Sequence, residues 1–162
     1  MKDLKLKQSA EKIFPEQLEI FKNKFDLTLP KSYEDFISEN NGGYPEISAF
    51  DNPNEDGSII NVFCCVRIEE PELDFLNPTP RLISSKSLIE SHQILEKNIS
   101  KYLYPFALDE GGGKFCISMR EEDFGSIYQV FLDGTVDEPV YVTDSFENFI
   151  NGLEDPSIYD VD

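Results

Sequence analysis

A cluster of three glycines separates two apolar stretches in the middle of the chain, within FALDEGGGKFCISM at residues 106–119. The flanking runs, 104–108 and 114–119, have the length and the apolar, aromatic-rich composition of β-strands. Because glycine-containing turns of a few residues commonly join neighbouring antiparallel strands, this stretch predicts a β-hairpin. A sheet that contains this hairpin is the strongest constraint on the fold.

A glycine cluster beside a lysine could also bind a phosphate. A phosphate-binding loop needs a glycine five positions before a Gly-Lys pair, which is then followed by Ser or Thr. In this chain Leu108 stands at the first of these positions, and Phe115 follows Lys114. Asp109 and Glu110 would also repel a phosphate at close range. The hairpin is therefore preferred over a nucleotide site.

Apolar residues at helical spacing predict four helices, two before the hairpin, one directly upstream of it and one near the end of the chain. Asn41-Gly42-Gly43 is expected to end the second helix, since glycine adopts the left-handed conformation of a helix C-terminus. Ser84 or Ser85 is expected to cap the third, and Asp144 and Glu147 have capping-box spacing before the fourth. The predicted apolar faces are Leu18, Phe21 and Phe25; Tyr33, Phe36 and Ile37; Leu88, Ile89, His92, Leu95 and Ile99; and Phe146, Phe149, Ile150 and Leu153.

Residues 59–68 alternate as in a half-buried strand, with Cys64 on the apolar face and Arg67 on the polar face. Further strands are predicted at 127–132 and 140–143, with a turn at Asp133-Gly134. Helices first and last with hairpin-linked strands between them indicate an α+β fold. We expect a single domain over residues 1–155, with a mostly antiparallel sheet flanked by about four helices, and an acidic C-terminal tail over 156–162.

The chain carries 32 acidic against 14 basic residues, a formal net charge of −18. Residues 1–31 hold seven lysines against five acids, so the whole excess lies in 32–162. This charge disfavours nucleic acid and anionic membranes and attracts basic proteins, although it also serves solubility without any partner. The N-terminus lacks a signal-peptide core, and the odd count of three cysteines favours reduced thiols, so we expect a cytoplasmic protein.

Few residues are candidates for catalysis or metal binding. His92 is the single histidine and lies on the predicted apolar helix face, which favours packing over general-base catalysis. Cys65 and Cys116 lack a nearby cationic cluster that would stabilise a thiolate. The NPNEDG stretch at 52–57 resembles a calcium loop, but it begins with Asn52 and has Phe63 where a bidentate carboxylate is needed. We therefore expect no catalytic site, no metal and no cofactor.

Clustered carboxylates are the remaining candidates, and they fit contacts with a basic partner better than acid–base hydrolysis, which needs a defined carboxylate separation. Two aromatic residues near the second helix and one in the acidic loop are candidate apolar contacts. The predicted partner-binding residues are Tyr44, Phe50, Glu69, Glu70, Glu72, Asp74, Phe75, Glu121, Glu122 and Asp123.

Three blocks together resemble the SUKH superfamily, which includes the fungal Smi/Knr-type cell-wall regulators and many bacterial proteins. Leu29-Pro30, Tyr33, Phe36-Ile37 and Asn41-Gly42-Gly43 resemble its first block; Phe106-Ala107, Asp109 and Gly112-Gly113 its central hairpin; Ser145-Phe146, Phe149 and Ile150 its closing helix. This chain has Lys114 and Ser118 where many members carry Asp or Asn after the paired glycines, so we carry over no ligand role to the hairpin.

The resemblance implies an α+β SUKH-like domain over residues 1–155 and a function in binding rather than catalysis. For a bacterial member it implies an immunity protein that neutralises a toxin domain, often a nuclease, by direct contact. The fungal branch implies instead a regulatory interaction hub or adaptor. A carboxylate-dependent hydrolase is the third hypothesis, with Glu121, Glu122 and Asp123 as acid and base.

Overall fold

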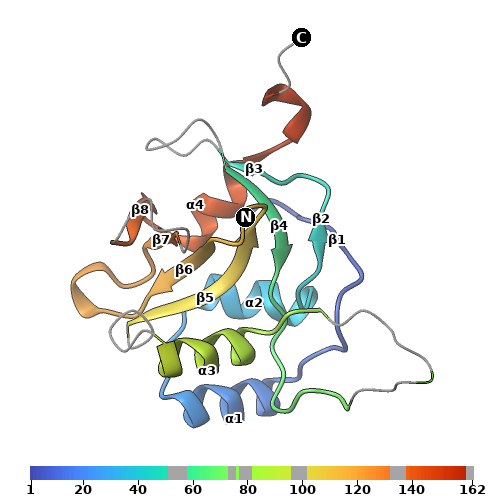
Figure 1. Cartoon of the computed structure of the whole chain (residues 1–162), viewed down its shortest axis with the longest axis vertical. Coiled ribbons are helices and arrows are strands. Elements are labelled where there is room, and N and C mark those ends of the chain that lie inside the picture. The colour runs from blue at the N-terminus through green and yellow to red at the C-terminus, as the bar shows by residue number, and fades with distance from the viewer. Residues whose placement is uncertain (51–57, 73–75, 77–81, 96–101, 132–137, 160–162) are drawn as a thin grey trace.

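The computed structural model describes residues 1–50, 58–72, 76, 82–95, 102–131 and 138–159 (Figure 1). The helices and strands of these residues follow one another as β1 (Leu6–Lys7), α1 (Pro15–Phe25), α2 (Lys31–Glu39), β2 (Tyr44–Pro45), β3 (Ala49–Phe50), β4 (Ser58–Phe63), α3 (Ser85–Leu95), β5 (Leu103–Asp109), β6 (Lys114–Ser118), η1 (Glu121–Asp123), β7 (Ile127–Val130), β8 (Val140–Thr143), α4 (Phe146–Asn151), β9 (Leu153–Glu154) and η2 (Pro156–Tyr159), where η marks 3₁₀ turns.

The strands form one curled sheet in the order β8-β7-β6-β5-β4-β3-β9, with every neighbouring pair antiparallel. A separate two-stranded sheet pairs β1 with β2. Together with the four helices, this confirms the predicted single α+β domain. The predicted strand at 140–143 is confirmed. The predicted strand at 127–132 is confirmed over Ile127–Val130, since Phe131 is no longer in the strand and residue 132 lies outside the described residues.

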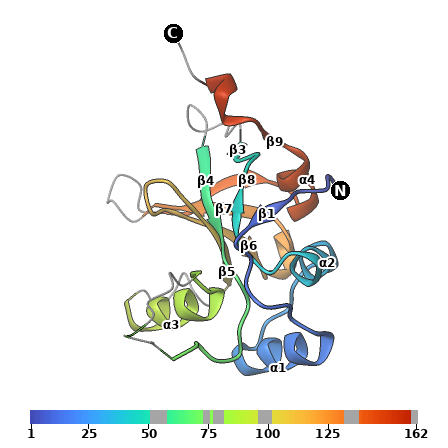
Figure 2. The ribbon, with the colours of Figure 1, turned by 90° about the vertical axis from the view of Figure 1, so that its right-hand side faces the viewer.

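The two faces of the sheet differ in what covers them. Figure 2 shows α2 and α4 on one side and α3 on the other. Phe106, Phe115 and Ile117 belong to the large core with residues of α1, α2 and α4, and Ile89 of α3 reaches the same core. Leu103 and Cys116 belong to a separate small cluster made of strand residues. Strand alternation places these two sets on opposite faces of β5 and β6.

The centre of the large core is aromatic. Phe146 makes edge contacts with Tyr33, Phe36 and Phe106, with ring centroids 5.2–5.4 Å apart. Such contacts contribute beyond the burial of apolar area alone. The apolar faces predicted for α1, α2 and α4 are confirmed, except that Phe25 is only half-buried.

The glycine cluster turns the β5–β6 hairpin, as predicted. Asp109 organises the turn, since one oxygen of its carboxylate accepts hydrogen bonds from Gly111 N at 2.9 Å and Gly113 N at 2.7 Å. The other oxygen accepts one from the Gln129 side chain at 2.9 Å. Asp109, whose charge disfavours phosphate binding, therefore also stabilises the turn of the hairpin.

The prediction of one strand over 59–68 was wrong in length and in which residues it exposes. β4 ends at Phe63, and residues Val62 to Arg67 are all buried. Arg67, expected on the polar face, is only 8% exposed. Strand alternation fails here because the chain leaves the sheet after Phe63. It then runs beside the segment that precedes α3, where Cys65 forms an isolated bridge with Ser84.

The N-terminal cap of α4 differs from expectation, whereas the predicted cap of α3 is confirmed. Ser145 caps α4 by accepting a hydrogen bond from Asn148 N at 3.0 Å, one residue after the predicted Asp144. For α3, Ser84 is the capping residue and accepts from Ser87 N at 3.1 Å. Residue Ile99 of its predicted apolar face, like Asp133-Gly134 and the NPNEDG stretch, lies outside the described residues.

Candidate functional site

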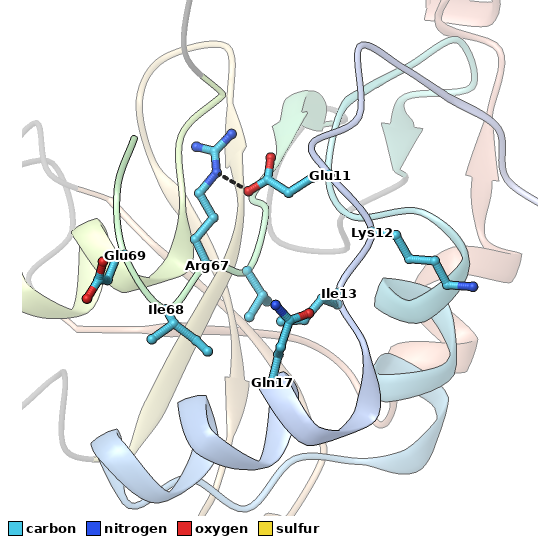
Figure 3. Close-up of a pocket in the computed structure, with 8 residues that line it drawn as sticks. Glu11, Lys12, Ile13, Gln17, Arg67, Ile68 and Glu69 are labelled. Carbon is cyan, nitrogen blue, oxygen red and sulfur yellow. Dashed lines mark hydrogen bonds and ion pairs between the residues drawn. The ribbon is translucent and has the colours of Figure 1, made fainter. Parts of the chain in front are cut away.

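A cleft of about 340 Å³ lies where the segment before α1 faces the segment after β4. Its volume is at the lower end of the range for ligand pockets, suited to one long side chain rather than a large cofactor. Figure 3 shows Arg67 and Glu11 meeting at the upper end of the cleft, whereas Glu69 lies at its outer edge and Lys12 points away from it. The lining residues are Glu11, Lys12, Ile13 and Gln17 on one wall and Val66, Arg67, Ile68 and Glu69 on the other.

Asn41 holds the two walls together. Its side-chain amide donates to Glu11 O at 2.7 Å and to Val66 O at 3.0 Å, and its oxygen accepts from Val66 N at 2.7 Å. Because Asn41 is only 4% exposed, water cannot replace these bonds easily. The residue predicted only to help end α2 is therefore a positioning residue for the cleft.

Gly42 and Gly43 allow this arrangement by letting three backbone segments approach closely. Gly42 has φ +74°, and a Cβ there would lie 2.7 Å from Cys65 N. Gly43 exchanges two backbone hydrogen bonds with Phe63, at 2.8 and 3.0 Å. The C-cap of α2 is Asn40 in extended conformation, so these glycines are needed for the close approach rather than for a left-handed helix C-cap.

Arg67 closes the upper end of the cleft in Figure 3. Its Nε donates to Glu11 at 3.1 Å, and its Nη1 donates to Leu82 O at 3.1 Å and lies 3.6 Å from Glu70. Partial burial alone would raise the pKa of Glu11, but a backbone hydrogen bond and Arg67 outweigh it, so this pKa is lowered. The buried cation is thus compensated by two carboxylates.

The acidic loop after β4 contains both engaged and exposed carboxylates. Glu69 and Glu72 are exposed, whereas Glu70 is half-buried, accepts a hydrogen bond from the Ser84 hydroxyl and pairs with Arg67. Glu70 therefore has a structural role. Asp74 and Phe75, also predicted as partner contacts, lie outside the described residues.

The two aromatic contacts predicted near α2 differ in exposure. Tyr44 is 39% exposed at the edge of the small sheet and remains a candidate contact. Phe50 is 8% exposed and stacks on Phe149, with ring centroids 4.9 Å apart, so the prediction of a surface contact is corrected. Pairing of β3 with β9 carries Phe50 into the core.

The second acidic cluster lies in the loop between β6 and β7. Glu121 and Glu122 are exposed on the η1 turn, whereas Asp123 is anchored. Its carboxylate accepts hydrogen bonds from Arg120, Ser118 and Tyr128 at 2.5–3.2 Å. Asp123 therefore fixes the loop that presents the other two acids, and its predicted contact with a partner stays a prediction.

The anchoring of Asp123 predicts a defined pH dependence. Desolvation alone would raise the pKa of this carboxyl, but the bonds from Arg120, Ser118 and Tyr128 outweigh it and lower the pKa to about 2. An aspartate in the unfolded chain has a pKa of about 3.9. The stabilisation by the ionised carboxylate is therefore complete above about pH 5 and is lost as the pH falls through about 2. Allowing for partial exposure, we expect Asp123→Asn to lower the unfolding free energy at pH 7 by about 1–2 kcal/mol.

Urea unfolding of both proteins at pH 7 and pH 3 measures this, and the difference should shrink at the lower pH. Glu121→Gln is the control, because this side chain is exposed, and it should change stability by less than about 0.5 kcal/mol. A difference for Asp123→Asn that stays constant with pH would contradict the assigned role.

The cysteines offer no activated nucleophile. All three are buried. Burial raises the pKa of Cys65 to about 11 and that of Cys116 to about 12, and raises the pKa of Cys64 as well. A thiolate is the reactive form of cysteine, and these environments disfavour it. His92 lies on α3 where only the backbone is described, so its expected packing role stays a prediction.

Across the described residues, no three His, Cys, Asp or Glu side chains gather as metal ligands would. The same part of the chain has no helix long and apolar enough to cross a bilayer.

The molecule is an α+β domain in which some charged side chains, such as Arg67 and Glu70, join segments of the chain, while other acids are exposed on the surface. The chain belongs to the SMI1/KNR4 family (SUKH-1), whose model matches residues 12–152. Proteins of this family are generally non-enzymatic immunity or regulatory proteins. No curated protein matches the chain significantly. The family assignment therefore comes from this match and agrees with the three sequence blocks.

Proposed function

We propose that this chain is a cytoplasmic immunity protein of a bacterium that neutralises a basic toxin domain, such as a nuclease, by direct contact. The observation that carries the proposal is membership of this family combined with the large excess of acidic residues after residue 31. A nuclease presents a positively charged groove to phosphates, and an acidic protein surface can occupy or shadow that groove. The partner is thus a protein, and neither nucleic acid nor a membrane.

Several acids are placed for such a contact. Glu69 and Glu72 are exposed after β4, and Glu121 and Glu122 are exposed on η1. Acids of this kind accelerate association by long-range attraction, while affinity depends on a few desolvated contacts. Asp123 holds the loop that carries Glu121 and Glu122 in one conformation, and such a loop loses less entropy on binding.

The test is protection from a toxin. If the neighbouring gene encodes a large secreted protein with a variable C-terminal domain, that domain is expressed in cells with and without this chain. We expect the chain to restore growth and to bind the purified domain. Loss of growth in both cases would contradict the proposal, and weak binding to several unrelated proteins would favour a regulatory hub instead.

The electrostatic part of the proposal is tested by association rates. We expect Glu121→Lys/Glu122→Lys to slow association with the toxin domain about tenfold at low salt, and the wild-type rate to fall as salt rises. The matched control is Glu39→Lys/Glu154→Lys, which makes the same charge change at exposed positions on α2 and β9. Equal slowing by both pairs would leave only an effect of net charge, and a rate independent of salt would remove the electrostatic account.

A further inference from the structure

The cleft between segments 11–17 and 66–69 has an apolar floor and a charged rim. Ile13 and Val66 are buried in the floor, and Ile68 beside them is half-buried. The rim carries the carboxylates of Glu11 and Glu69, both on exposed residues. This combination matches the two parts of a long basic side chain, which buries its methylene stem against apolar surface and keeps its charge at the edge.

The two cations that line the cleft, Arg67 and Lys12, do not cancel the negative charge at its rim. Arg67 is compensated by Glu11 at 3.1 Å and Glu70 at 3.6 Å. Lys12 extends away from the other lining side chains in Figure 3, and its ammonium lies 5.5 Å from the centre of the Phe14 ring. Only one of the two oxygens of Glu11 contacts Arg67, and Glu69 makes no ion pair among the residues that the structure describes. The charge available to a ligand at the rim is therefore negative.

We infer that this cleft receives a lysine or arginine side chain from the surface of the partner protein. The inference rests on the proposed function and adds to it the place and the chemistry of one contact. A single charged side chain inserted into a partly apolar cleft at the centre of a contact is the arrangement from which binding hot spots are made. Asn41 and Arg67 act as positioning residues, because they hold the two walls at a fixed separation.

The first experiment tests the cleft without the partner. Nα-acetyl-lysine methylamide and Nα-acetyl-norleucine methylamide share the same four-carbon stem, and only the former carries an ammonium group. Amide chemical shifts of residues 11–17 and 66–69 should saturate with a Kd on the order of 10 mM, as for a small fragment. The lysine fragment should bind about two to five times more tightly than the norleucine fragment, and Glu69→Gln should remove most of this preference.

Three results of this titration would overturn the inference. They are an absence of saturable shifts at these residues, equal binding of the two fragments, and saturation by inorganic phosphate at the same residues. The last would show that the cleft is a site for anions.

The second experiment uses the toxin domain and compares two acids of the same loop. Glu69 lines the cleft, whereas Glu72 is exposed three residues further along and does not. We expect Glu69→Lys to weaken binding at least about tenfold and Glu72→Lys only about two- to threefold, since the latter changes only long-range attraction. Ile68→Trp should block the cleft and weaken binding similarly, and Ile47→Trp, at a residue that is 36% exposed, is its control.

These variants separate the two proposals. If the wild-type chain fails to protect cells, the proposed function fails and the inference falls with it. If the wild type protects and Glu69→Lys binds as tightly as Glu72→Lys, the inference alone is wrong. Thermal unfolding of each variant, compared with the wild type, shows whether a loss of binding comes from a loss of fold.

Discussion

Gly42→Ala is expected to destabilise the protein by about 3 kcal/mol or more, the largest effect that we predict for a single added methyl group. Two causes add. Alanine is strained at φ +74°, and its Cβ would lie 2.7 Å from Cys65 N and 2.9 Å from Cys64 C. Both neighbours are backbone atoms of a buried segment, so relief requires a shift of the chain rather than a change of rotamer.

Gly112→Ala isolates the first of these causes. Gly112 has φ +87° in the β5–β6 turn, but no atom lies within 4 Å of an added Cβ. We expect this variant to be destabilised only by the strain of the left-handed conformation, which lowers its unfolding free energy by about 1–2 kcal/mol. Urea unfolding of the two variants beside the wild type measures the difference. Equal losses would show that the close approach of Gly42 to the 64–65 backbone contributes nothing.

Asn41→Ala is expected to cost about 3 kcal/mol, because it leaves buried backbone groups without partners. The variant removes three hydrogen bonds of 2.7–3.0 Å, and the two that join Asn41 to Val66 are buried. Val66 loses partners for both its N–H and its carbonyl. The loss also separates the walls of the cleft, so we expect weaker binding of the lysine fragment as well as lower stability.

The neighbouring Asn40 provides a matched control. Its side chain is half-buried and makes one longer hydrogen bond, to Leu4 O at 3.3 Å. Asn40→Ala should therefore cost less than about 1 kcal/mol and leave the fragment affinity unchanged. Chemical denaturation gives the stability of both variants, and the chemical-shift titration gives their affinity. An equal loss for Asn40→Ala and Asn41→Ala would contradict the special role of Asn41.

The sequence predicts the elements whose signal is local. Periodic apolar residues indicate α1, α2 and α4, and apolar runs around a glycine turn indicate the β5–β6 hairpin. Strands β1, β2, β3 and β9 were missed because each has two residues, too few to show alternation. Their pairing depends on contacts between distant segments, such as β3 with β9.

The candidate site was only partly predictable for a related reason. Glu69, Glu72, Glu121 and Glu122 could be proposed from charge alone, and the structure leaves them exposed. The cleft itself could not be predicted, because its two walls are far apart in the sequence. They are joined by the long-range hydrogen bonds of Asn41 and by that of Arg67 to Glu11, 56 positions away. The Asn-Gly-Gly block was visible in the sequence, but a helix stop explains the same residues without any long-range contact.

The place of α4 in the core bears on how the chain folds during synthesis. Phe146 and Phe149 are fully buried and contact aromatic residues of α2, β3, β5 and β6, and β9 then pairs with β3. None of these contacts can form until α4 and β9 have been synthesised and have left the ribosome. The core therefore closes last from this side, and a nascent chain that reaches only residue 145 lacks the centre of its own interior.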